Sequence, residues 1–207
     1  MLLNIISINI AILSYIVFTL YYSNKPNIKK SSLNYYQTLP LSLFNLFVCL
    51  PFTTFIWNIF FSNTNIIFNL KELLFIIPSI VVGSTIFTLI HYLLHRCKLL
   101  YKKIHSIHHK AIITKSFDAL YVHPIEFIFG MILPFLFSCY LFNLSFFTSN
   151  VVFIISIHEN IRAHATYTNI ISEHNYHHRL FNVNYDSFPY IFSKYITKSF
   201  IKKKYLN

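Results

Sequence analysis

Three short motifs concentrate the histidines of this sequence. They are HYLLH at residues 91–95, HSIHH at 105–109 and HNYHH at 174–178. Residues three or four positions apart lie on one face of a helix, so each motif presents two or three imidazoles side by side. Neutral imidazole is a good ligand for iron, zinc, copper and nickel. We therefore interpret the three motifs as parts of a metal centre.

The number of histidines favours two metal ions over one. The motifs hold eight histidines, whereas a structural zinc site uses four ligands and commonly includes cysteine. The three cysteines, Cys49, Cys97 and Cys139, form no CxxC pair. A single histidine on an apolar face is more often an ordinary buried residue. Three motifs beside apolar runs indicate ligation, because uncompensated polar groups at membrane depth are costly.

Long apolar runs surround the motifs. Hydrophobic residues make up 55% of the 207-residue chain and charged residues 11%. A helix needs about 20 apolar residues to cross a bilayer. Runs of that length are 2–22, 39–61 and 73–94, and the run 124–160 is long enough for a hairpin. The sequence predicts an all-α integral membrane helical bundle of about four transmembrane helices, including a hairpin, with a cytosolic histidine-rich metal-binding cap.

Breaks in these runs suggest how the chain is divided. We expect Pro51 to kink the second run, and a polar break near Asn143 and Ser145 to turn the hairpin. Residues 1–72 then form N-terminal membrane helices and a linker. Residues 73–207 form the domain that carries the histidine motifs.

The basic residues predict the orientation of the chain. The formal net charge is +11, which for a soluble protein would suggest nucleic acid. Here, however, the basic residues lie between and after apolar runs, so we expect no nucleic-acid partner. With the histidine motifs in the cytosol, sixteen of the 17 Lys and Arg residues fall on the cytosolic side, and only Lys71 on the other. This bias follows the positive-inside rule.

Four segments together resemble a known family. HYLLHR, LYKKIHSIHH, ALYVHPIE and EHNYHHRLFNVNYDSF, between residues 87 and 190, resemble the fatty acid hydroxylase or sterol desaturase superfamily, in particular its sterol C5-desaturase and C4-methyl oxidase types. The resemblance implies a membrane enzyme, of the endoplasmic reticulum in a eukaryote, with two iron ions bound by histidines. Such enzymes use O2, and electrons from an external donor such as cytochrome b5, to hydroxylate or desaturate a sterol or fatty acyl lipid.

The resemblance also implies which residues hold the metals. ISIHE at 155–159 resembles a segment in which some members carry a further histidine. The implied ligands are His91, His95, His105, His108, His109, His158, His174, His177 and His178. Residues expected either to bind metal or to orient the ligands are His123, His164, Glu126, Glu159 and Glu173. Of these, His164 has no firm counterpart in the family, and an interfacial polar role is favoured for it.

Departures from the family pattern leave a second interpretation open. Phe87 and Thr88 stand where members often have an acidic residue, and Asp186 stands where a glycine is common. The Trp-Asp and Gly-Thr elements expected further on are missing. The alternative is a non-catalytic or degenerate metal-binding membrane protein of the same fold. A channel or transporter is disfavoured because the histidines gather at the ends of the apolar runs.

Overall fold

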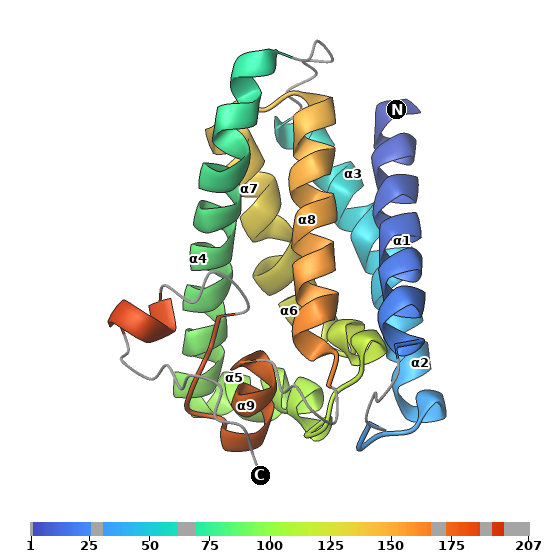
Figure 1. Ribbon diagram of the computed structural model, residues 1–207, viewed down its shortest axis with the longest axis vertical. Helices are drawn as coiled ribbons and strands as arrows, with labels where there is room; N and C mark the ends of the chain where they lie inside the picture. Colours follow the sequence, from blue (N-terminus) through green and yellow to red (C-terminus); the bar gives the residue numbers. More distant parts are fainter. Residues whose placement is uncertain (1, 26–30, 62–68, 167–172, 187–191, 197–207) are drawn as a thin grey trace.

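The computed structural model describes residues 2–25, 31–61, 69–166, 173–186 and 192–196. All regular elements in these ranges are helical (Figure 1), which confirms the predicted all-α class. Long helices run antiparallel along the long axis of the molecule. Their bounds are α1 Leu2–Ser23, α2 Tyr35–Phe44, α3 Leu50–Phe61, α4 Ile76–Arg96, α7 Leu133–Leu141 and α8 Phe146–His164.

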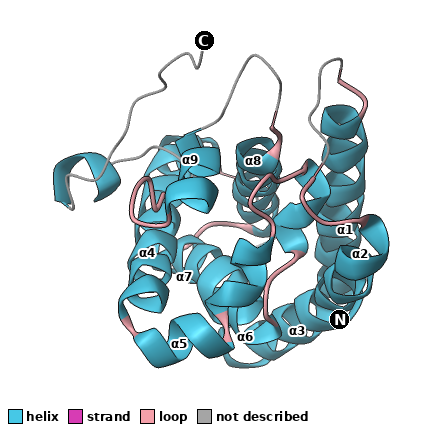
Figure 2. Ribbon diagram, turned by 90° about the horizontal axis from the view of Figure 1, so that it is seen from below, coloured by secondary structure: helices cyan, strands magenta, loops and turns pink. Residues whose placement is uncertain are grey.

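Short helices gather at one end of this bundle. We call this end the cap, and it consists of α5 Lys98–Lys103, η3 His105–Lys110, η4 Ser116–Leu120 and α9 Glu173–Leu180. Seen from the cap end, α9 lies between the ends of α4 and α8 (Figure 2). The remaining short helices are η1 Asn45–Cys49, η2 Leu70–Phe75, α6 Pro124–Glu126, η5 Phe127–Ile132 and η6 Phe192–Ile196.

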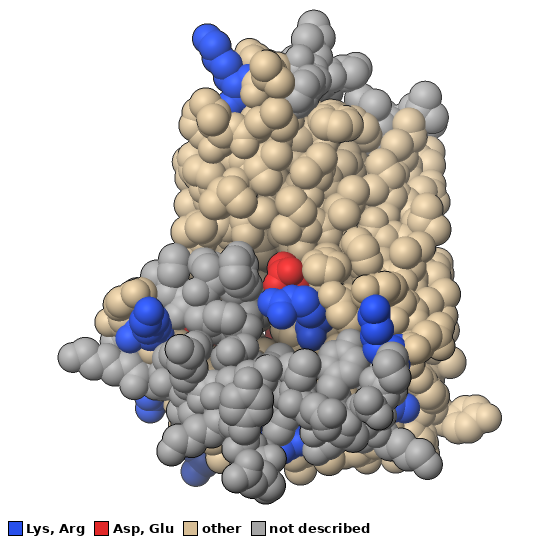
Figure 3. All heavy atoms as spheres, viewed as in Figure 1, with Lys and Arg blue, Asp and Glu red and all other residues tan. Residues whose placement is uncertain are grey.

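Four of the described helical stretches are long and apolar enough to cross a membrane. They are Ile5–Ser23, Tyr35–Trp57, Leu70–Arg96 and Pro124–Leu141. These stretches agree with the predicted runs, and α8 returns as the second half of the predicted hairpin. On the face shown in Figure 3, a band without charged side chains separates the two ends, and basic residues gather around the cap. The predicted membrane-embedded helical bundle is confirmed.

The hairpin turns where the polar break predicts it. Helix α7 ends at Leu141, Asn143 adopts a positive φ of 51°, and the Ser145 side chain caps the start of α8. At this turn the Glu72 carboxylate accepts hydrogen bonds from the Ser145 backbone N–H at 2.9 Å and from its hydroxyl at 2.6 Å. Helix η2, which leads directly into α4, is thereby tied to the start of α8 at the end remote from the cap.

Two of the spans contain a π-helical turn just before a proline. Helix η1 precedes Pro51, and the Leu50 N–H bonds to the Asn45 carbonyl five residues back. Helix η5 likewise precedes Pro134, and the Leu133 N–H bonds to the Ile128 carbonyl. A proline has no N–H, and its ring collides with the carbonyl four residues earlier, so a wider turn relieves the collision. At Pro51, where the sequence predicts a kink, the structure has such a π-helical turn.

The first of these turns also connects the bundle to the cap. The Asn45 side chain is fully buried, and its amide donates to the carbonyls of Leu120 at 3.0 Å and Val122 at 2.9 Å. The segment that follows η3 is therefore fixed against the second span. The hydrophobic core crosses the same boundary, because Leu46 and Leu50 pack in one cluster with Leu120 of η4.

Close packing of α4 on α7 gives a test of the fold. A Cβ atom at Gly83 would lie 2.6 Å from Phe135 Cδ1, whereas one at Gly130 would lie 3.6 Å from its nearest neighbour. Overpacking of this kind costs about 1–3 kcal/mol, so we expect Gly83→Ala to lower the midpoint of thermal unfolding in detergent. Gly130→Ala is the control and should not lower it. Equal midpoints for the two variants would contradict the packing described.

Candidate metal centre

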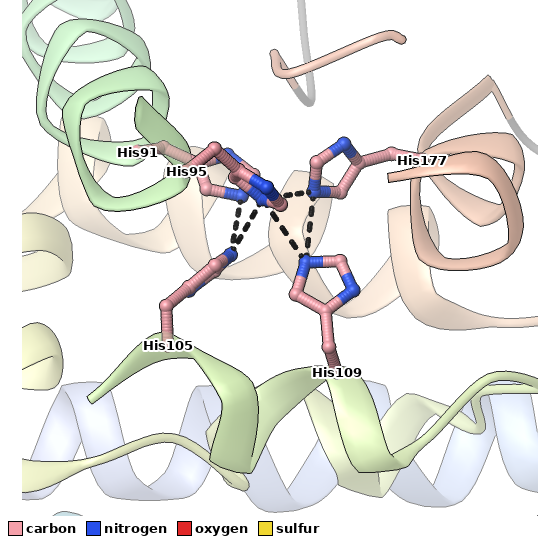
Figure 4. A group of neighbouring side chains, drawn as sticks. All are labelled: His91, His95, His105, His109 and His177. Atoms are coloured by element: carbon pink, nitrogen blue, oxygen red, sulfur yellow. Dashed lines mark hydrogen bonds between the residues drawn. The ribbon is translucent and has the colours of Figure 1, made fainter. Parts of the chain in front are cut away.

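Nine of the histidines gather in two clusters at the cap end of the bundle. The first histidine cluster is made of side chains from α4, η3 and α9, shown together in Figure 4. Its members are His91, His95, His105, His109 and His177. The second histidine cluster is made of side chains from η3, α8 and α9. Its members are His108, His164, His174 and His178. In each cluster one nitrogen per ring lies within 4.8 Å of those of all the other members.

In the first histidine cluster the Nε2 atoms point toward a common centre. His95 Nε2 lies 2.9 Å from His105 Nε2, 3.0 Å from His177 Nε2 and 3.1 Å from His109 Nε2. His109 and His177 are also 3.1 Å apart at Nε2. Figure 4 shows these rings converging from three separate parts of the chain. Such convergence is what a single bound cation requires.

Hydrogen bonds at the opposite ring nitrogens fix the tautomers. His91 Nδ1 lies 2.6 Å from the Tyr185 carbonyl oxygen, which can only accept, so Nδ1 carries the proton. His105 Nδ1 similarly donates to the Glu126 carboxylate at 2.7 Å. In the neutral tautomers that these bonds select, both Nε2 atoms are unprotonated, and they face each other at 3.0 Å. Two lone pairs repel at that distance unless a cation lies between or beside them.

The second histidine cluster shows the same pattern. His108 Nδ1 donates to the Tyr121 carbonyl at 3.1 Å, and His164 Nδ1 donates to the Asn160 carbonyl at 2.8 Å. Their unprotonated Nε2 atoms face each other at 3.2 Å. His178 is fully buried, and neither of its ring nitrogens has a hydrogen-bond partner within the described chain. A buried polar group without a partner is costly, and a metal ion would satisfy it.

Burial keeps five of the cap imidazoles neutral. It lowers the pKa of His108 to about 3 and lowers the pKa of His109 still further. The pKa values of His174, His177 and His178 also fall well below the usual range, chiefly through burial and secondarily through neighbouring imidazoles. These rings are therefore unprotonated at pH 7, which is the state that binds metal.

The HNYHH motif is held in place by Asn175, the asparagine within it. Asn175 lies in α9, and its Oδ1 is 2.6 Å from the hydroxyls of both Thr114 and Thr166. His177 in the same helix donates from Nδ1 to the Val183 carbonyl at 2.8 Å. Helix α9 is thus bonded to the segment after η3 and to the segment after α8. These bonds set the direction in which its histidines point.

Asp186 has a local structural part in this arrangement. Its carboxylate accepts a hydrogen bond from the Ser193 N–H at 3.1 Å, and the Ser193 hydroxyl accepts one from the Tyr185 N–H at 2.8 Å. The backbone of Tyr185 is the one whose carbonyl holds His91. Asp186, which stands where family members commonly have a glycine, therefore helps to hold the backbone that orients His91 of the first histidine cluster.

The structure does not bring all the implied ligands together. His158 lies outside both clusters: it is bonded to the Tyr22 hydroxyl at 2.8 Å and to Glu159 at 3.0 Å. Glu159 is also bonded to Arg162, at 2.6 Å. His123 caps the start of α6 by accepting from the Ile125 N–H at 3.2 Å.

Helix geometry explains why His164, and not His158, joins a cluster. Six residues separate them in α8, and at 3.6 residues per turn they lie on different faces. Only one of the two can face the cap interior, and the structure places His164 there. One sequence feature could have identified His164 as a cluster member. It lies at the cap end of a long helix, as His95 does in α4. Glu126 contacts His105, and the Glu173 side chain lies outside the described part of the chain.

Two neighbouring cavities lie next to the clusters: cluster histidines line the smaller one, and the larger one shares Phe87, Met131 and Asn160 with it. The larger, of about 70 Å³, has mainly apolar walls that include Leu50, Phe135 and Phe153. The smaller, of about 10 Å³, is lined by His108 and His164 among others. A water molecule needs roughly 10–15 Å³ on this measure, so the larger cavity has space for a short apolar segment and the smaller for about one small molecule.

Comparison with known proteins gives one family and two relatives. Residues 76–196 match the family model described as fatty acid hydroxylase. Sphinganine C4-monooxygenase 2 of Arabidopsis thaliana is 32% identical over 123 residues, which is 54% of this chain and 47% of the relative. Sphinganine C4-monooxygenase 1 of the same plant is 31% identical over 107 residues, 46% of this chain and 41% of the relative. The matched part spans less than half of either relative. No solved structure matches the chain.

The bond between Glu126 and His105 gives a test of the first histidine cluster. Removing a carboxylate that orients a ligating imidazole typically lowers metal affinity about 10- to 100-fold. We expect Glu126→Gln to lose metal from one of two sites when the purified protein is dialysed against a weak chelator and its metal content measured. Glu159→Gln is the control, because Glu159 contacts His158 outside the clusters. Equal metal retention by the two variants would contradict the role of Glu126 in orienting His105.

His164 and His158 provide a second test, in which helix geometry and family resemblance make opposite predictions. The structure predicts that His164→Ala loses about one metal ion per chain and that His158→Ala retains both, as measured by elemental analysis. Metal loss from His158→Ala alone would contradict the position of these two side chains. Gel-filtration profiles in detergent would show whether each variant is folded.

Proposed function

Since the chain belongs to the fatty acid hydroxylase family, we propose that it is an integral membrane enzyme that uses O2 to hydroxylate a lipid. The family matches the one expected from the histidine motifs. The observation that carries the proposal is the pair of buried histidine clusters beside an apolar cavity. Each cluster supplies neutral nitrogen ligands, and the cavity supplies a place for the apolar part of a substrate.

We propose iron as the metal of both clusters. His91, His95, His105, His109 and His177 would hold one ion, and His108, His164, His174 and His178 the other. Imidazole suits several transition metals, so the choice of iron rests on the family. When bound, the iron ions supply the activation of O2 that an unreactive C–H bond requires.

The protein's own residues orient the site and exclude water from it. The Tyr185 and Tyr121 carbonyls hold His91 and His108 by their Nδ1 protons, so that Nε2 is free to bind metal. Glu126 does the same for His105 and places a negative charge close to the first histidine cluster. The apolar walls of the larger cavity replace water around a bound lipid chain.

We propose that the electrons come from a separate protein. The chain has only two glycines, Gly83 and Gly130, too few for a glycine-rich nucleotide-binding motif. Lys98, Lys102 and Lys103 are exposed on α5, and this surface suits an acidic donor of the cytochrome b5 type. It also suits anionic lipid head groups. In a eukaryotic host we place the protein in the endoplasmic reticulum membrane, with the cap in the cytosol.

The names of the relatives refine the substrate. Both are sphinganine C4-monooxygenases, enzymes named for oxygenating sphinganine at C4. We therefore propose hydroxylation in preference to desaturation, and a long-chain lipid in preference to a sterol. The apolar cavity next to the second histidine cluster has the character that such a chain requires.

The test is lipid analysis of cells that express the protein under ¹⁸O2. We expect a hydroxylated lipid that carries ¹⁸O with the wild type and none with the double variant His108→Ala, His177→Ala, which removes a ligand from each cluster. Metal binding by the wild type without any labelled product would contradict the enzymatic proposal. It would favour the non-catalytic alternative.

A further inference from the structure

Asn160 lies at the junction of the two cavities. It lines both the larger apolar cavity and the smaller one beside the second histidine cluster, as do Phe87 and Met131. Its own backbone carbonyl accepts the Nδ1 proton of His164 at 2.8 Å. The Asn160 side chain is therefore placed between the space for an apolar chain and one of the candidate metal sites.

The Asn160 amide is available to a ligand. A carboxamide has two N–H donors and one oxygen acceptor. Within the described chain, no backbone or side-chain group bonds to this amide, and the residue is half-buried rather than fully enclosed. By contrast, Asn150 in the same helix donates to the Phe146 carbonyl at 2.8 Å.

The other polar groups of the larger cavity are already engaged. The Tyr15 hydroxyl donates to the Phe117 carbonyl at 3.0 Å, and the Ser156 hydroxyl donates to the Val152 carbonyl at 2.8 Å. The remaining walls are almost entirely hydrocarbon. Asn160 is thus the side chain of this cavity that retains both donors and an acceptor for a bound molecule.

We propose that the Asn160 amide binds a neutral polar group of the lipid, a hydroxyl or an amide, and so determines which carbon lies beside the second histidine cluster. The inference rests on the proposed function and deepens it by naming the substrate chemistry. A charged head group would lose its hydration in an apolar cavity, whereas a hydroxyl or amide can exchange its water for the carboxamide. Asn160 acts here as a positioning residue.

The arrangement also predicts where such a lipid is oxidised. With the polar group at Asn160, the apolar chain extends along α8 past Ile157 to Phe153, over about 10 Å of helix axis at 1.5 Å per residue. The carbons beside the histidines are then those close to the polar group. Carbons further along the chain lie away from the cap.

The experiment is a competition assay with the metal-loaded full chain in lipid nanodiscs. A diazirine-bearing hexadecanol labels the cavity, and labelling of the peptides that contain Phe127 and Met131 is measured by mass spectrometry. Hexadecanol and hexadecane compete as matched probes with and without a hydroxyl. One net hydrogen bond is worth roughly 1 kcal/mol, so Asn160→Leu should reduce the preference for hexadecanol over hexadecane about five- to tenfold. Asn150→Leu, the matched control, should keep it.

The outcomes separate this inference from the proposed function. Labelled cavity peptides with an unchanged preference in Asn160→Leu would overturn the part assigned to Asn160 and leave the lipid cavity standing. Absence of cavity labelling in the wild type would overturn both. Metal content tests whether Asn160→Leu retains the site. If it does not, Asn160→Ser, which keeps a hydrogen-bonding group, should retain a preference that Asn160→Ala loses.

Discussion

Facing lone pairs of neutral, buried imidazoles are the constraint on which this structure depends. His91 and His105 in one cluster, and His108 and His164 in the other, have their Nδ1 protons committed to fixed acceptors. Their Nε2 atoms then meet at 3.0 and 3.2 Å with no proton between them. Burial lowers the pKa of His108 and so opposes its protonation. A metal cation is a physical means of stabilising contacts between such lone pairs.

The rest of the fold serves to hold that arrangement at the edge of a membrane. The ligands come from α4, η3, α8 and α9, and the long helices bring these elements to one end of the bundle. Polar side chains inside the molecule fix the cap: Asn45 bonds the chain after η3, and Asn175 bonds α9. At the opposite end, Glu72 ties η2, which leads into α4, to the start of α8. The apolar cavity lies between these two ends, beside the second histidine cluster.

The motifs and apolar runs predicted the membrane bundle, its hairpin and eight of the clustered histidines. Helical spacing alone could not decide between His158 and His164, because the phase of α8 is set by packing against α1 and the cap. The π-helical turns depend on how Pro51 and Pro134 are accommodated, and proline positions do not specify that. The junction at Asn160 joins residues distant in the sequence, so no local pattern revealed it.

The measurement that tests the central claim most directly is native mass spectrometry of the full chain purified from iron-supplemented cells. Two bound metal ions per chain are predicted for the wild type. One ion is predicted for His95→Ala, which affects only the first histidine cluster, and one for His178→Ala, which affects only the second. A wild-type chain that is folded yet binds no metal, or single variants that both retain two ions, would contradict the account.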